Sequence, residues 1–347
     1  MRRKIRLSLI MLTMVMVFAI VPTNLNHVFA STSQDSLFKQ ASTEFNIDLA
    51  KFSLSLSAAA YGNTCANIEK MLTDYGFTND TVYDKASYEK ASKMGTDLVG
   101  YSFANKKISC NDSEYTLVAV VIRGTSGDNE WISNFNVNDS GNNPALHEGF
   151  SKAEKSLLTE LNHYIKSLNL NKLNTKFLIT GHSRGAAVAN LLAADLSRSE
   201  KLADQSNIYS YTFATPNVAK IGYNNYLNIF NAVNPADIVT EIPLAKWGYS
   251  KYGVTYALPD EGRINAENLA AEKKALTQLT AMAPTVKDFE KSKLSLLLSK
   301  DNIIPTGATS AHAPQVYMNA LNEVNSNELS AKIFDLQLKL LPNTNYA

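Results

Sequence analysis

Ser183 lies in a pattern that can turn a serine into a nucleophile. Residues 181–185 read Gly-His-Ser-Arg-Gly. The apolar segment 176–180 predicts a buried strand before it, and the Ala- and Leu-rich segment 186–196 predicts a buried helix after it. In a sharp strand-to-helix turn of this kind, two glycines let the backbones approach closely while the serine hydroxyl stands above the sheet. We therefore predict that Ser183 is the catalytic nucleophile.

Such a nucleophile needs a base and an acid, which follow it in the chain in hydrolases with this turn. His312 is the only histidine after Ser183, so it is the predicted base. The acid should follow the second strand after the turn, which we place at 227–233. Asp237 is then the predicted acid, because a carboxylate there would hold the tautomer of His312. Glu241 is the alternative.

Two backbone donors are needed to stabilise an oxyanion. The N–H of Arg184, the residue after the nucleophile, is one candidate. The other is Thr125, which ends the run Arg-Gly-Thr directly after a predicted strand, 115–122. The alternative for this run is an ordinary turn at the end of a strand.

A short apolar group follows Thr125. Trp131, Ile132 and Phe135 would share one side of a short helix, which suits a lid or an acyl-binding surface; a buried turn of the core is the alternative. Segment 136–147 starts like a calcium loop, but its twelfth residue is histidine rather than glutamate. We predict no metal site and no cofactor.

The remaining pattern predicts an α/β-hydrolase fold: a mostly parallel sheet with helices on both faces. Strand 98–104 and the strand before Thr125 should form a hairpin. Two helical segments separated by Pro284, together 261–299, predict a helical insertion before His312. The other expected elements are helices at 48–61, 66–75 and 149–168 and a strand at 208–213.

The first 30 residues resemble a secretory signal peptide, with a basic start, a fifteen-residue apolar run and Ala30 at the expected cut. That run is shorter than the ~20 residues of a spanning helix. We therefore expect an exported protein without a membrane span, consisting of a single domain over 31–347.

Charge and cysteine content narrow the function further. Removing four of the 33 basic residues with the signal leaves 29, against 32 acidic residues, a net charge of −3. This balance argues against a nucleic-acid partner. Cys65 and Cys110 are the only two cysteines and could form one disulfide or none. The sequence gives no oligomeric state.

Several segments, in this order, resemble the class 3 (fungal-type) triacylglycerol lipase family. They are Val121–Thr125, Trp131 with Asn134, His147–Phe150, Thr180–Gly185, Thr212–Pro216, Asp237–Pro243 and His312. The resemblance implies an α/β-hydrolase in which Ser183, Asp237 and His312 form the triad and Thr125 and Arg184 form the oxyanion hole. It also implies that 131–135 occupies the lid position. Arg184 and Ala186 depart from the usual Leu and Gly, and segment 261–299 has no counterpart.

We therefore expect an exported serine ester hydrolase that forms an acyl-enzyme and acts on acylglycerols or other lipid esters. A lipid–water interface is one setting for this reaction. The alternatives are a phospholipase A1, a short-chain or feruloyl-type esterase, or a catalytically silent envelope protein with the same fold.

Overall fold

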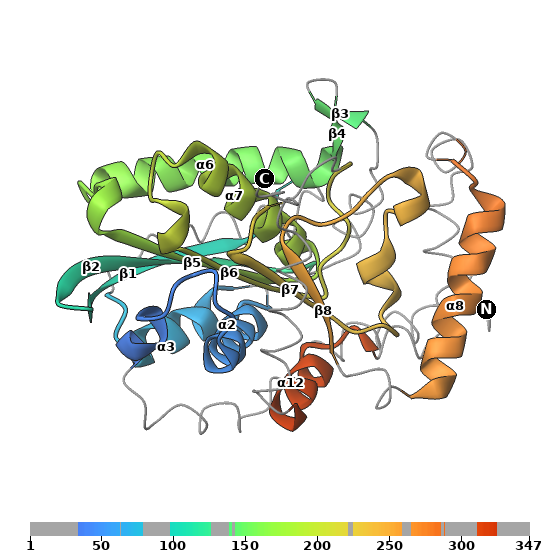
Figure 1. The fold of residues 1–347 in the computed structure, drawn as a ribbon, viewed down its shortest axis with the longest axis horizontal. Helices are drawn as coiled ribbons and strands as arrows, with labels where there is room; N and C mark the ends of the chain where they lie inside the picture. Colours follow the sequence, from blue (N-terminus) through green and yellow to red (C-terminus); the bar gives the residue numbers. More distant parts are fainter. Residues whose placement is uncertain are drawn as a thin grey trace, which may run out of the picture.

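The computed structural model describes residues 34–62, 64–78, 98–125, 139–140, 143–220, 225–258, 265–285, 288 and 311–324. Within these ranges a six-stranded sheet with the order β1-β2-β5-β6-β7-β8 forms the centre (Figure 1). Its strands are β1 (Tyr101–Cys110), β2 (Ser113–Ile122), β5 (Thr175–His182), β6 (Ile208–Phe213), β7 (Ile229–Val233) and β8 (Val254–Ala257). Only β1 runs antiparallel to its neighbour.

The predicted hairpin is confirmed as β1 and β2, joined at Asn111 and Asp112. Both residues have positive φ angles, 51° and 62°, as a tight two-residue turn between twisted strands requires. β1 continues to Cys110, well past the predicted end at 104. The charged residues Lys106 and Lys107 did not suggest a strand in the sequence. The structure accommodates them because β1 is an edge strand of the sheet.

Helices cover both faces of the sheet, as predicted. In Figure 1, α6 (Glu148–Ser167) and α7 (Arg184–Ser199) lie above it, and α2 (Ile47–Ala59), α3 (Ala66–Asp74) and α12 (Pro314–Glu323) lie below. Side chains of β2 alternate between the two layers, as the two-residue period of a strand dictates. Leu117, Ala119 and Val121 pack in the cluster with α2, whereas Val118, Val120 and Ile122 pack in the cluster with α6 and α7.

The connections bring three chain segments to one edge of the sheet. α6 links β2 to β5, α7 links β5 to β6, and the strands β2, β5, β6, β7 and β8 of the large sheet are parallel. Parallel strands end at the same edge, which is where ligands bind in open α/β sheets. Thr125, Ser183 and Asp237, which follow β2, β5 and β7, therefore meet on one side.

The helical insertion is described in its first part, where α8 (Ala266–Met282) confirms a helix within the predicted range. The second predicted helix, 286–299, and the signal segment 1–30 lie outside the described residues, apart from Asp288. β8 was not predicted, nor was the small hairpin of β3 (Asp139–Ser140) and β4 (Asn143–His147). The short 3-10 helices are η2 (Gln34–Phe38), η3 (Lys172–Asn174), η4 (Gln205–Asn207), η5 (Ile238–Glu241) and η6 (Ala245–Trp247).

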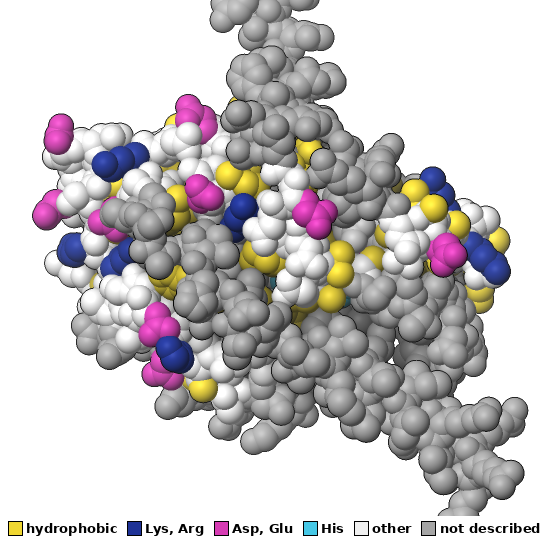
Figure 2. All heavy atoms as spheres, turned by 90° about the horizontal axis from the view of Figure 1, so that it is seen from below, with side chains coloured by type: hydrophobic (Ala, Val, Ile, Leu, Met, Phe, Trp, Pro, Cys, Tyr) yellow, Lys and Arg dark blue, Asp and Glu magenta, His cyan; other side chains and the backbone are white. Residues whose placement is uncertain are grey.

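Two surface properties bear on partners. In the part of the chain that the structure describes, every helix is too short or too polar to cross a membrane. On the face in Figure 2, basic and acidic side chains are interspersed, and hydrophobic side chains gather nearer the middle. The described residues of this face therefore form no block of one charge.

Candidate active site

Ser183 occupies a strained turn between β5 and α7. Its φ and ψ are 60° and −129°, a conformation that costs a non-glycine residue of order 1–3 kcal/mol. A Cβ atom on Gly181 would lie 2.4 Å from the Gly185 carbonyl carbon, and one on Gly185 would lie 2.2 Å from the Ile122 carbonyl oxygen. Only glycine fits at these two positions, so the turn can be this sharp.

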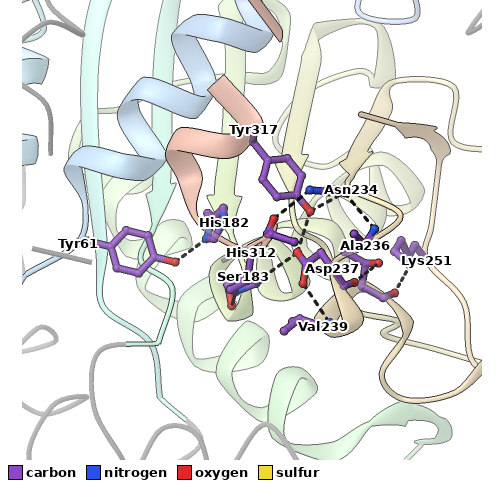
Figure 3. A network of polar contacts seen from close by, with 12 residues as sticks. Tyr61, His182, Ser183, Asn234, Ala236, Asp237, Val239, Lys251, His312 and Tyr317 are labelled. Carbon is purple, nitrogen blue, oxygen red and sulfur yellow. Dashed lines mark hydrogen bonds and ion pairs between the residues drawn. The ribbon is translucent and has the colours of Figure 1, made fainter. Parts of the chain in front are cut away.

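The structure brings the three predicted triad residues into one hydrogen-bonded chain (Figure 3). His312 Nε2 lies 2.8 Å from Ser183 Oγ, and His312 Nδ1 lies 2.8 Å from Asp237 Oδ2. All three side chains are buried, with Asp237 fully enclosed. Because a carboxylate only accepts, His312 donates from Nδ1 and presents Nε2 to the serine hydroxyl. This arrangement can remove the proton of Ser183 as the hydroxyl attacks a carbonyl carbon.

Asp237, rather than the alternative Glu241, contacts the histidine. Asp237 also accepts hydrogen bonds from the Val239 N–H at 3.1 Å on Oδ1 and from the Tyr317 hydroxyl at 2.8 Å on Oδ2. Burial, and secondarily the charge of Asp237, raises the pKa of Tyr317 well above its usual value. Tyr317 therefore stays protonated and donates to the carboxylate.

Asn234 joins the acid turn to the segment that carries His312. Its amide Nδ2 donates to the Ala311 carbonyl at 3.1 Å, and its backbone N–H donates to the Tyr317 hydroxyl at 2.9 Å. Its Oδ1 accepts from the Ala236 N–H at 3.0 Å. The side chain and the backbone N–H of this one residue thus connect the acid turn, the segment before His312 and Tyr317.

His182 lies next to the base. In the structure the Tyr61 hydroxyl lies 2.6 Å from His182 Nδ1, and the rings of His182 and His312 are 4.9 Å apart. Burial, followed by the nearby His312, lowers the pKa of His182 well below its usual value. A neutral imidazole therefore packs against His312.

The candidate oxyanion donors stand at the predicted places. Arg184 is the first residue of α7, and the first N–H groups of a helix have no intrahelical acceptor. Thr125 follows β2, the neighbour of β5. A Cβ atom on Gly124 would lie 2.8 Å from the His182 carbonyl oxygen, so the two backbones are in close contact here. The structure supports this placement; the donor role remains a prediction.

The Arg184 side chain is buried. Its guanidinium lies 5.8 Å from the centre of the Phe150 ring and donates to the Leu98 carbonyl at 3.4 Å. Its charge is therefore directed toward α6 and the segment before β1. Trp131, Ile132 and Phe135, the predicted lid or acyl-binding residues, lie outside the described residues.

The histidines at positions 147 and 163 take no part in the hydrogen bonds of the triad. His147 caps α6 by accepting from the Phe150 N–H at 3.3 Å, and His163 is exposed. Cys65 and Cys110 are both buried free thiols. Sequence reasoning missed Tyr61, Asn234 and Tyr317, which contact the residues around the triad. Asn234 could have been found, because the run Asn-Pro-Ala-Asp before the acid predicts an Asx turn.

Comparison with known proteins agrees with this geometry. Residues 119–247, which hold the end of β2, the Ser183 turn and Asp237, match the model of a family described as lipase (class 3). This part of the chain is therefore similar to class 3 lipases.

Its relatives include fungal lipases. The chain is 28% identical over 231 residues to a lipase of Rhizomucor miehei, covering 64% of this chain and 61% of that protein. It is 26% identical to the secreted mono- and diacylglycerol lipase 1 of Fusarium solani, covering 45% and 48%. The chain thus spans about half to two thirds of the length of these relatives.

Solved lipase structures give weaker likenesses. One is a triacylglycerol lipase with a serine protease triad (TM-score 0.45, 23% identity, 62% of this chain and 81% of that chain). Another is the lipase of Rhizopus microsporus var. chinensis (TM-score 0.43, 18% identity, 69% and 82%). The fold assignment rests on the family match and on the sheet itself.

Proposed function

We propose that this protein, which is similar to class 3 lipases over residues 119–247, is a serine ester hydrolase that cleaves acylglycerols or other lipid esters. The observation that carries the proposal is the chain from Ser183 through His312 to Asp237, with 2.8 Å at both steps, on a strained strand-to-helix turn. Nucleophile, base and acid within hydrogen-bond reach are the signature of acyl transfer. The names of the fungal relatives supply the lipid part of the proposal.

The reaction follows from the geometry. Ser183 Oγ attacks the ester carbonyl carbon while His312 Nε2 takes the hydroxyl proton, and Asp237 stabilises the resulting imidazolium. The N–H groups of Thr125 and Arg184 stabilise the oxyanion. His312 then gives its proton to the leaving alcohol, which leaves an acyl-enzyme on Ser183. A water molecule, deprotonated by His312, attacks the acyl carbon and releases the acid.

The proposed setting is outside the cell. Three similar proteins are named as secreted lipases, and segment 1–30 has the pattern of a signal peptide. The proposed substrate is a lipid ester at a lipid–water interface. Segment 131–135 is proposed as the lid.

The function is tested with a chain-length series of p-nitrophenyl esters. Wild type should hydrolyse them, Ser183→Ala should lose at least 10⁴ in kcat, and the exposed-site control His163→Gln should retain wild-type rates. A maximum at long chains would support a lipase, and a maximum at acetate or butyrate would indicate a short-chain esterase. Absence of hydrolysis across the whole series would reject the enzyme and favour a silent hydrolase fold.

The interfacial part has its own test, the rate measured against tributyrin concentration across its solubility limit. Exposing a lid's apolar face to water costs about 25 cal/mol per Å², and a lipid surface removes this cost. The rate should therefore jump at the limit for wild type and less for Trp131→Ser. A smooth hyperbola in both proteins would reject a lipase with interfacial activation.

A further inference from the structure

Lys251 holds the turn that carries the acid. Lys251 lies in the loop between η6 and β8; its side chain is partly buried, and its ammonium group points at the turn after β7 (Figure 3). Nζ donates to the Thr240 carbonyl at 2.7 Å and to Asn217 Oδ1 at 2.8 Å. Thr240 itself bonds back to Asp237: its N–H donates to the Asp237 carbonyl at 3.1 Å and its hydroxyl does so at 2.9 Å.

Asn217 extends this anchor to the far end of the turn. Its Nδ2 donates to the Pro243 carbonyl at 2.7 Å, and its backbone N–H donates to the Ile242 carbonyl at 3.2 Å. Lys251 therefore binds the middle of segment 237–243 directly and its end through Asn217. Directly or through Asn217, Lys251 is thus connected to backbone carbonyl groups of the turn that carries the triad acid.

The charge of Lys251 also fits its surroundings. The described ionisable groups that act on it are the carboxylates of Asp237 and Glu241. Glu272 on α8 is buried and close enough for these two carboxylates to help raise its pKa, although burial is the main cause. Burial lowers the pKa of Lys251 to about 8 against the opposing effect of both carboxylates. Lys251 is therefore positively charged at neutral pH and below.

We propose that Lys251 is a positioning residue for the triad: it anchors the turn 237–243 and supplies the positive charge that opposes the carboxylates of Asp237 and Glu241. This inference rests on the proposed ester hydrolysis and adds to the triad a fourth, charged side chain that does not contact Ser183 or His312 in the hydrogen bonds of the site.

Two consequences follow from the charge and the anchor. Without the cation, the carboxylates of Asp237 and Glu241 lose the opposing charge of Lys251, so the acidic limb of the pH–rate profile should move to higher pH. Without the anchor, Asp237 is held less firmly, and small displacements of catalytic groups lower the rate of the chemical step. Substrate affinity should change little, because the hydrogen bonds of Lys251 go to the turn that carries Asp237 and to Asn217, not to Ser183 or His312.

The experiment compares Lys251→Met, Lys251→Arg and the control Lys246→Met, which removes an exposed cation from the neighbouring η6. For each, kcat and KM for p-nitrophenyl butyrate and the rate of labelling by a fluorophosphonate are measured from pH 5 to 8. We expect Lys251→Met to lower kcat about tenfold with KM within about twofold. Its acidic limb should move up by about half a pH unit or more. Lys251→Arg and Lys246→Met should keep the wild-type limb.

Circular dichroism and thermal unfolding separate these effects from misfolding. If Lys251→Met is unfolded, Lys251→Arg decides: it keeps the charge but not the fit, so it should lower kcat while leaving the acidic limb in place. An unshifted limb in folded Lys251→Met, or a limb that moves equally in Lys251→Arg, would overturn the proposal. A wild-type protein that neither hydrolyses the ester nor reacts with the probe would instead overturn the proposed function.

Discussion

Asp237→Asn tests the acid assignment most sharply. The carboxylate accepts three hydrogen bonds: from His312 Nδ1 and the Tyr317 hydroxyl on Oδ2, and from the Val239 N–H on Oδ1. An amide of the same shape offers only one oxygen. If its NH₂ group replaces Oδ2, it faces His312, which must then accept at Nδ1 and carry its proton on Nε2. That tautomer cannot take the proton of Ser183.

If the NH₂ group instead replaces Oδ1, it faces the Val239 N–H, and two donors oppose each other. In either orientation the imidazolium formed during the reaction loses its buried counter-charge. The expected loss is about 10⁴ in kcat, the size seen for this change in the serine protease triad, which corresponds to roughly 5.5 kcal/mol in the barrier. The volume of the side chain is unchanged, so the protein should stay folded.

The assay is kcat for p-nitrophenyl butyrate, with Glu241→Gln as the matched control four residues along the same turn. Glu241 makes no hydrogen bond to His312, so its amide should cost less than about tenfold. Thermal unfolding verifies that both variants are folded. An Asp237→Asn enzyme with more than a tenth of wild-type kcat, or a larger loss in Glu241→Gln, would refute the reasoning.

Three further predictions concern other residues. His312→Ala should abolish turnover while His163→Ala, at an exposed position on α6, retains most of it; comparable activity in the two variants would remove His312 as the base. Tyr317→Phe should lower kcat about tenfold and the free energy of unfolding by about 2 kcal/mol, because Asp237 loses a donor and the buried Asn234 N–H loses its acceptor; urea unfolding with unchanged stability would contradict this. Burial raises the pKa of Glu154 to about 7, so the folded protein keeps a proton that the unfolded chain releases near pH 4.5, and stability falls as pH rises between these values. Glu154→Gln should remove this fall, up to about 3 kcal/mol, in urea unfolding measured at pH 5 and pH 8.

The local parts of the site could be predicted from the sequence. The turn around Ser183 is specified by residues adjacent in the chain, since the two glycines are needed for close contacts that the turn itself creates. Because the base follows the nucleophile in the chain order of this fold, His312 was the only histidine that could be the predicted base. Counting strands gave Asp237, because β7 is indeed the second strand after the turn.

The surroundings of the triad could not be predicted, because they depend on tertiary packing. Tyr61 ends up beside His182, 121 residues away, and Tyr317 reaches Asp237 across 80 residues. Nothing in the sequence indicated a role for Lys251, since one lysine in a polar loop usually points to solvent. β8 was missed because it has only four residues, of which Val254 alone is buried, and so short a segment forms no clear apolar alternation.

The cysteines illustrate the same limit. The sequence left open whether Cys65 and Cys110 form a disulfide, because nothing in their spacing indicates the distance between them. In the structure Cys65 precedes α3, Cys110 ends β1, and both stay buried thiols. A pairing between distant positions is decided by the fold and not by local pattern.

The central claim is that Ser183 is a nucleophile activated by His312 and Asp237. The most direct measurement is intact-mass and peptide-level mass spectrometry after reaction with a fluorophosphonate. The account predicts a single phosphonyl adduct on Ser183 in wild type, no adduct in Ser183→Ala, and labelling slowed at least a hundredfold in His312→Ala. An adduct on another residue, or equal labelling rates in wild type and His312→Ala, would contradict it.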